Sequence, residues 1–134
     1  MDILIVDDNQ IFIKSIKMLL KEKSDINNIY EAGNGKDGLE IIKEHLPEIV
    51  ITNIGMPEMT GLELTRIIKS KYPYLKIIVL TINNNEEIKR KILDSEAEGY
   101  IIKNADRIEL YKAIDIVADG GIYYSNEILN VKSS

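Results

Sequence analysis

The chain has 134 residues, enough for one domain, and its 45% hydrophobic and 29% charged residues are typical of a globular protein. Its net charge of −5 argues against direct nucleic-acid binding, which requires a basic face, and the lack of cysteine excludes disulfides and thiolate metal sites. No apolar run approaches the roughly 20 residues that span a bilayer, and no basic region precedes the first apolar run. We therefore expect a cytoplasmic protein without membrane contact.

Five short runs rich in Ile and Val alternate with longer stretches of helical periodicity. The runs, which we predict to be strands, are Ile3–Val6, Ile29–Ala32, Ile49–Thr52, Lys76–Leu80 and Gly99–Ile102. Nearly continuous apolar runs of this length are typical of parallel strands covered on both faces. In the stretch after the first run, Phe12, Ile16 and Leu19 fall on one face of the expected helix.

The helical stretches carry start signals. Thr60 and Glu63 have the spacing of a capping box, and Asp106 precedes Glu109 in a similar arrangement. The asparagine run at 83–85 supplies a cap for the helix that follows it. These signals support the alternation of strands and helices that the apolar pattern indicates.

Strict alternation predicts right-handed crossovers and a parallel sheet. Five strands favour an α/β, flavodoxin-like, doubly wound sheet of order 2-1-3-4-5 with helices on both faces. In such a fold, ligands bind beyond the carboxyl ends of the strands. The residues at those ends are therefore the candidates for function.

Polar residues stand at or just after the ends of the first, third, fourth and fifth runs: Asp7, Asp8, Asn53, Gly55, Thr81 and Lys103. Carboxylates suit Mg²⁺, which is a hard cation that prefers oxygen ligands. We expect Gly55 to offer its backbone carbonyl, because a residue without Cβ gives the loop room to turn. A hydroxyl and an ammonium opposite the metal would neutralise the charge of a phosphoryl group.

Four segments carry a resemblance to a known family: LIVDDNQ at 4–10, IVITNIGMPEMTGLEL at 49–64, IIVLT at 77–81 and EGYIIK at 98–103. With them the chain resembles the receiver domain of bacterial two-component response regulators, a CheY-like domain, over residues 1–120. The segment 109–129 further resembles the end of receivers of the NarL/FixJ (LuxR-type) branch. The resemblance implies that residues 121–134 are a C-terminal extension or the start of a linker to an output domain beyond this sequence.

The resemblance also implies roles for single residues. It makes Asp7 and Asp8 the acidic metal-binding pair and Gly55 the carbonyl ligand. It assigns the switch hydroxyl to Thr81 and the neutralisation of phosphate to Lys103. It further identifies Tyr100 as the aromatic residue whose rotamer reports the state of the domain.

One position departs from the family pattern. The family accepts a phosphoryl group on an aspartate at the end of the third strand, where this chain has Asn53. A carboxamide is neutral and its nitrogen lone pair is delocalised, so it cannot attack phosphorus as a carboxylate does. The metal would also lose one anionic ligand. We therefore expect no phosphorylation at Asn53 and a Mg²⁺ site that is weak or absent.

Three hypotheses follow. The first is a receiver that acts through protein contacts, with a histidine kinase or another signalling protein as partner. The alternative is a phosphorylation-controlled LuxR-type transcription regulator, with Asn53 replacing a natural aspartate and an output domain that alone would bind nucleic acid. The third, an aspartate-based phosphatase that attacks through Asp7 or Asp8, lacks a cap domain, so we predict that the chain is not an enzyme. Formation of a homodimer, and the face that it would use, are left open.

Overall fold

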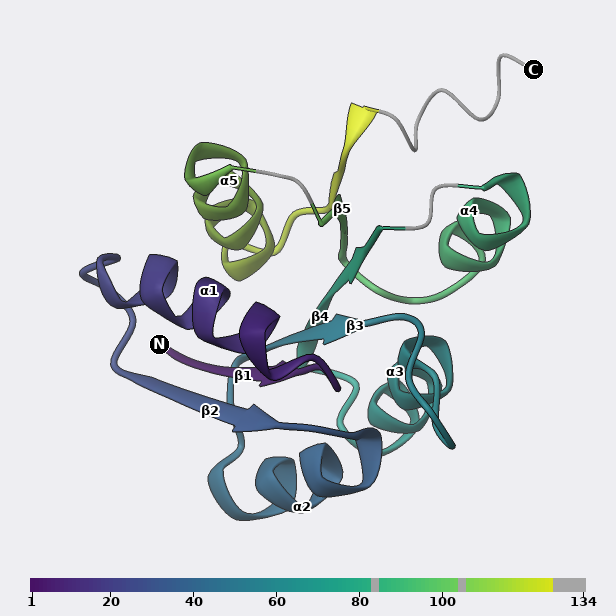
Figure 1. Ribbon diagram of the computed structural model, residues 1–134, viewed down its shortest axis with the longest axis horizontal. Coiled ribbons are helices and arrows are strands. Elements are labelled where there is room, and N and C mark those ends of the chain that lie inside the picture. Colours follow the sequence, from purple (N-terminus) through teal and green to yellow (C-terminus); the bar gives the residue numbers. More distant parts are fainter. Residues whose placement is uncertain (83–84, 104–105, 127–134) are drawn as a thin grey trace.

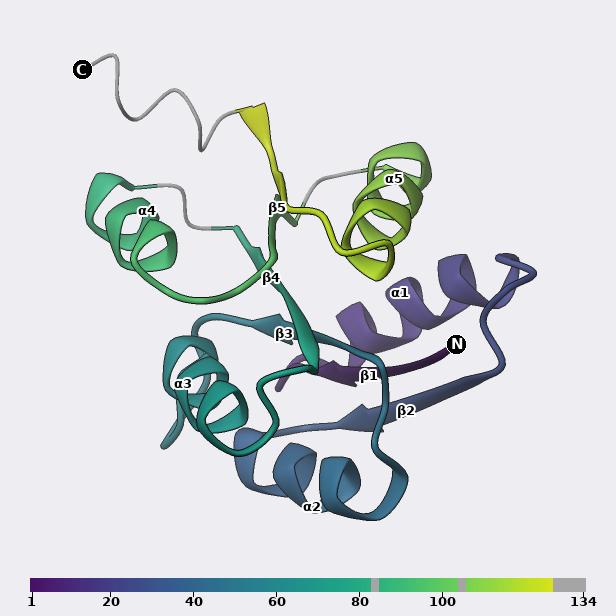
Figure 2. The same ribbon diagram turned by 180° about the vertical axis from the view of Figure 1, so that it is seen from behind.

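The computed structural model describes residues 1–82, 85–103 and 106–126, which form a sheet between two layers of helices (Figures 1 and 2). The strands are β1 (Asp2–Val6), β2 (Asn28–Ala32), β3 (Ile49–Asn53), β4 (Lys76–Thr81), β5 (Gly99–Ile102) and β6 (Tyr123–Tyr124). The helices are α1 (Gln10–Lys21), α2 (Gly35–His45), α3 (Gly61–Lys71), α4 (Glu86–Leu93) and α5 (Arg107–Ala118).

The strands lie in the order β2-β1-β3-β4-β5-β6, and every neighbouring pair is parallel. The predicted flavodoxin-like order 2-1-3-4-5 is therefore confirmed, and each predicted strand agrees with the structure within one residue at each end. The sixth strand was not predicted. It lies beyond residue 120, in the segment for which the sequence suggested an extension or a linker.

The core has two layers, one on each face of the sheet, because successive strand residues point to opposite faces. Leu4 and Ile77 pack with α2, α3 and α4, whereas Ile3 and Ile78 pack with α1 and α5 (Figure 1). All four side chains are fully buried, as expected for strands covered on both faces. Within the described part of the chain, no helix combines the length and the apolar character needed to cross a membrane.

The predicted helix starts are found where they can be described. Thr60 and Glu63 form a complete capping box at the start of α3. The Asp106 side chain accepts a hydrogen bond in the first turn of α5, and Asn85 does the same for α4. The other two asparagines of that run, at 83–84, lie outside the described residues.

The loop between β3 and α3 is fixed by the absence of a side chain at Gly61. A Cβ at this position would lie 2.1 Å from the backbone oxygen of Asn53, which is closer than any contact that real Cβ atoms make. The Gly61 amide donates to the Ile54 carbonyl at 2.8 Å, so α3 begins directly against the end of β3. Gly55 is different from what we expected, because a Cβ there would meet nothing within 4 Å. Its loop therefore does not require a residue without Cβ.

We predict that Gly61→Ala lowers the free energy of unfolding by about 3 kcal/mol, because the new methyl group displaces backbone and not a flexible side chain. Gly55→Ala is the matched control in the same loop, and its effect should stay within about 0.5 kcal/mol. Urea denaturation of the two variants and the parent measures both values. Equal midpoints for the two variants would contradict the proposed contact.

Candidate functional site

The parallel pairing of β1, β3, β4 and β5 brings their carboxyl ends to one edge of the sheet. Asp7 follows β1, Asn53 ends β3, Thr81 ends β4 and Lys103 follows β5. These residues come from segments almost 100 positions apart in the sequence. The sheet therefore places the predicted polar residues at the same edge.

Asp7 is the most buried acid at this edge, with 1% of its surface exposed. Its Oδ1 accepts a hydrogen bond from the Asn9 amide at 2.9 Å, and its own amide donates to the Ala32 carbonyl at 3.0 Å. Its Oδ2 forms an ion pair with Lys103 Nζ at 2.9 Å but, among the described residues, no hydrogen bond of good geometry. Asp7 Oδ2 is therefore a buried oxygen whose charge is balanced by the Lys103 ammonium.

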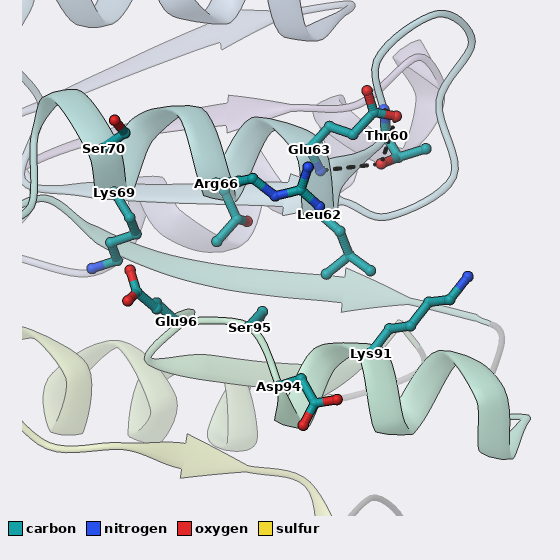
Figure 3. Close-up of a pocket in the computed structure, with 11 residues that line it drawn as sticks. Thr60, Leu62, Glu63, Arg66, Lys69, Ser70, Lys91, Asp94, Ser95 and Glu96 are labelled. Carbon is teal, nitrogen blue, oxygen red and sulfur yellow. Dashed lines mark hydrogen bonds between the residues drawn. The ribbon is translucent and has the colours of Figure 1, made fainter.

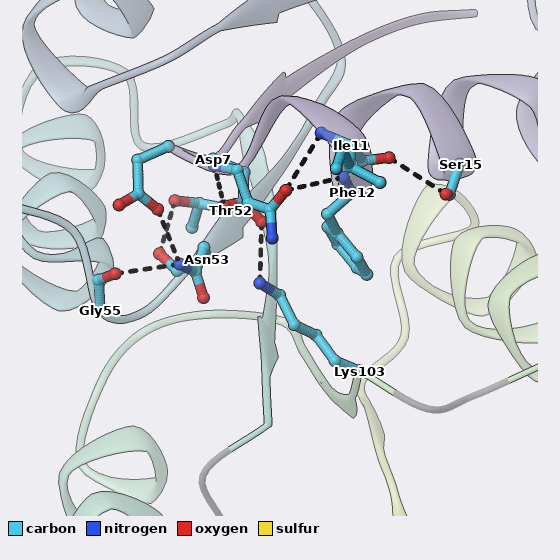
Figure 4. Close-up of polar contacts among 10 residues, drawn as sticks. Asp7, Ile11, Phe12, Ser15, Thr52, Asn53, Gly55 and Lys103 are labelled. Atoms are coloured by element: carbon cyan, nitrogen blue, oxygen red, sulfur yellow. Dashed lines mark hydrogen bonds and ion pairs between the residues drawn. The ribbon is translucent and has the colours of Figure 1, made fainter.

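Lys103 is held in this position from two sides. Its side chain is only 11% exposed, and its ammonium lies 4.2 Å from the centre of the Phe12 ring, over the face of the aromatic group (Figure 4). Its backbone amide donates to the Thr81 carbonyl at 2.8 Å. The sequence placed Phe12 only on the apolar face of a helix. Its contact with Lys103 could have been suspected only from its position, because Phe12 lies in the first helical turn after Asp7 and Asp8.

The Asn53 side-chain amide is hydrogen-bonded to two of the predicted metal ligands, Gly55 and Asp8. Figure 4 shows its bond to Gly55. Its Nδ2 donates to the Gly55 carbonyl at 3.0 Å and, more weakly, to Asp8 Oδ1 at 3.5 Å. Both partners are acceptors, so the nitrogen and not the oxygen of the amide must face them. The N–H group thus occupies the region between the two oxygens that the resemblance assigns to a metal.

The residues present can hold a divalent cation only after a rearrangement. Two carboxylates, Asp7 and Asp8, and the Gly55 carbonyl are hard oxygen donors of the kind that Mg²⁺ takes. Asn53 could join them by turning its amide oxygen inward, which would break its present hydrogen bonds. Among the described residues, no group of three or more His, Cys, Asp or Glu could hold a metal. The donors present are of the kind that Mg²⁺ takes, and the weakness of this site stays a prediction.

Thr81 and Tyr100 lie next to this pocket but on the other face of the sheet. Tyr100 belongs to the core layer of Val79, its partner in β4, and is fully buried. Thr81 is also fully buried and points to the same face, two residues after Val79. Burial raises the pKa of the Tyr100 phenol above its ordinary value. The switch role of Tyr100 stays a prediction.

A groove of about 940 Å³ lies elsewhere, between α3 and the end of α4 (Figure 3). Arg66 of α3 and Lys91 of α4 stand on its two sides, and acids such as Glu63 and Asp94 line it as well. The lining carries charges of both signs and contains none of the predicted site residues. This groove is therefore separate from the strand ends where the predicted site residues lie.

Comparison with known proteins identifies the family whose members share this sequence pattern and fold. The family model for the response regulator receiver domain matches residues 3–115. The isolated receiver domain of RcsB from Salmonella enterica serovar Typhimurium, solved with the phosphomimetic BeF₃⁻, superposes with a TM-score of 0.90 at 28% identity. That superposition covers 98% of this chain and 97% of the solved one.

Two curated relatives extend well beyond this chain. The transcriptional regulatory protein DegU of Brevibacillus brevis is 31% identical over 121 residues, which are 90% of this chain and 51% of DegU. The nitrate/nitrite response regulator NarL of Escherichia coli K12 is 30% identical over 129 residues, which are 96% of this chain and 60% of NarL. The chain therefore spans about half to three fifths of the length of these relatives.

We predict that Asn53→Asp destabilises the metal-free protein by about 1 kcal/mol or more, because a third carboxylate then faces Asp8 without an N–H donor. Added Mg²⁺ should stabilise this variant more than it stabilises the parent, since the metal binds the folded state more tightly. Asn53→Ala is the control, because it removes the amide hydrogen bonds and adds no charge. Melting temperatures with and without Mg²⁺ measure these effects, and identical responses of parent and Asn53→Asp would contradict them.

We also predict a loss of stability at alkaline pH. Burial raises the pKa of Tyr100, and burial followed by the charge of Glu98 raises that of Tyr124. A folded-state pKa above the unfolded value of about 10 gives stability that is present below pH 10 and is lost as the pH rises. Phenolate absorbance should show two of the seven tyrosines ionising last, together with unfolding. Simultaneous ionisation of all seven in a folded protein would contradict this.

Proposed function

The chain belongs to the response regulator receiver domain family, and we propose that it signals through protein contacts without being phosphorylated at Asn53. The observation that carries the proposal is the Asn53 amide, which donates to the Gly55 carbonyl and to Asp8 at the strand end where the family resemblance places the phosphoacceptor. An amide in that position closes the pocket with hydrogen bonds and offers no nucleophile.

The chemistry of phosphoryl transfer supports this proposal. An acyl phosphate forms when an anionic carboxylate oxygen attacks phosphorus, and a carboxamide has no such oxygen. Lys103, which would neutralise a phosphoryl group, is engaged with Asp7 and the Phe12 ring. Mg²⁺, when bound, would supply positive charge for a phosphoryl group, and Asp7, Asp8 and Gly55 would hold it weakly. The pocket keeps the arrangement of a receiver and lacks its reactive atom.

The partners follow from the family. Receiver domains interact with histidine kinases, so we propose a histidine kinase or another signalling protein as the partner of this chain. We propose Thr81 and Tyr100, which share one face of the sheet, as the residues that report the state of the pocket to such a partner. In this proposal the chain is a signalling module and not an enzyme, because the carboxamide of Asn53 offers no nucleophile where the family accepts a phosphoryl group.

A second candidate function is favoured by the names and lengths of the relatives. DegU and NarL are named as a transcriptional regulatory protein and a response regulator, and each is much longer than the matched segment. In this candidate, the chain is the receiver of a LuxR-type transcription regulator whose output domain alone binds DNA. Asn53 would then stand in place of a natural aspartate. The natural coding sequence distinguishes the two candidates directly.

We predict that incubation with acetyl phosphate and Mg²⁺ leaves the intact mass of the protein unchanged. The Asn53→Asp variant is the matched control, and it should gain the mass of one phosphoryl group because the rest of the pocket is in place. A phosphorylated adduct on any residue of the unchanged pocket would overturn the proposed function. An Asn53→Asp variant that stays unmodified would count against the second candidate.

A further inference from the structure

The C-terminal strand β6 covers the outer edge of β5. The Tyr123 amide donates to the Glu98 carbonyl at 2.9 Å, and the Ser125 amide donates to the Tyr100 carbonyl at 2.9 Å. The Tyr124 ring meets the Tyr100 ring edge to face, with centroids 6.5 Å apart. Without β6, the edge of β5 and one side of Tyr100 would be open to solvent.

Ser125 connects this strand to the pocket. It is fully buried, and its hydroxyl accepts a hydrogen bond from the Ile102 amide at 3.3 Å. The next residue, Lys103, donates its own amide to the Thr81 carbonyl and pairs its ammonium with Asp7. One continuous path of hydrogen bonds and covalent backbone therefore runs from Asp7 through Lys103 to Ser125.

We propose that the pairing of β6 with β5 is coupled to the Lys103–Asp7 ion pair, so that β6 and Ser125 report the state of the pocket to the chain beyond them. Loss of the ion pair loosens the end of β5 and weakens the attachment of β6. By thermodynamic reciprocity, release of β6 weakens the ion pair to the same degree. This inference goes beyond the proposed function, because it holds whether or not residue 53 can be phosphorylated.

The size of β6 suits a reversible element. The strand has two residues, so few interactions must break for it to separate from β5, and short edge elements open at lower free energy than the core. The contacts that hold it are nevertheless specific: the Tyr123 hydroxyl donates to Glu109 of α5 at 2.6 Å, and Ser125 is buried. Under the proposal, this small element moves between the paired arrangement seen here and a released one.

The position of β6 near the C-terminal end of the chain would let this coupling act on the residues that follow it. The chain has further residues after β6 and Ser125. The matched segment is only 51% of DegU and 60% of NarL, so both relatives are much longer than it. Under the proposal, β6 changes how the residues that follow it are held.

Hydrogen exchange of the Ser125 and Tyr123 amides tests the coupling. Lys103→Met removes the ion pair and keeps the aliphatic stem. It should speed the exchange of both amides about tenfold, which corresponds to a loss of roughly 1.4 kcal/mol in the free energy of opening. Lys23→Met is the matched control, because Lys23 is also mostly buried, pairs with Asp25 and Asp115 and contacts an aromatic ring. Equal exchange in the two variants would show that β6 is a fixed cover and would overturn the proposal.

A second experiment tests the coupling in the opposite direction, from β6 to the pocket. It does not require the Lys103→Met variant to be stable. Ser125→Ala removes one hydroxyl and leaves the backbone hydrogen bond to Tyr100 possible. It should shift the NMR signals of the Asp7 backbone amide and the Asn53 side-chain amide, whereas Ser70→Ala on the exposed side of α3 should leave them unchanged. Unchanged signals in Ser125→Ala would overturn the coupling without bearing on phosphorylation, which the acetyl phosphate experiment tests separately.

Discussion

The pocket depends on the neutralisation of one buried carboxylate. Asp7 is almost fully enclosed at the end of β1, and a charge left unpaired in such a position costs several kcal/mol. Its countercharge comes from Lys103, which lies beyond β5 and reaches across the ends of β3 and β4. The ion pair therefore joins strands that do not touch each other. Asn53 and Thr81 end the two strands that lie between β1 and β5.

The difference between an amide and a carboxylate at residue 53 decides how the neighbouring oxygens are satisfied. Asn53 has the shape of aspartate, but its N–H group satisfies two acceptors, the Gly55 carbonyl and Asp8. An aspartate would present only acceptors to these oxygens, and three carboxylates would then repel one another in the absence of a cation. With the amide, the chain supplies its own donors: Asn53 on one side and Lys103 on the other. Asn53 and Lys103 thus place an N–H group and an ammonium beside the oxygens to which the family pattern assigns a metal.

The strands and their order could be predicted because long Ile and Val runs and their alternation with helices leave few topologies. The strand Tyr123–Tyr124 could not, since two residues show no periodicity and the glycines before them indicate a turn. Its pairing depends on tertiary contacts, among them the hydrogen bond from the Ile102 amide to the buried hydroxyl of Ser125. The same holds for Phe12: periodicity predicts its buried face, but its contact with Lys103 depends on where another strand ends.

A receiver that forms no acyl phosphate must obtain the energy for a change of state from binding. A ligand shifts an equilibrium only by its difference in affinity for the two states, and a shift from 1:99 to 99:1 requires about 5.5 kcal/mol. Breaking a buried ion pair such as Lys103–Asp7 costs about 3–5 kcal/mol, most of that amount. A partner that competes with β6 for the edge of β5 would gain strand pairing there and, through the proposed coupling, weaken this ion pair. Under the proposal, the protein's output is therefore set by what contacts the β5 edge and not by a covalent bond at Asn53.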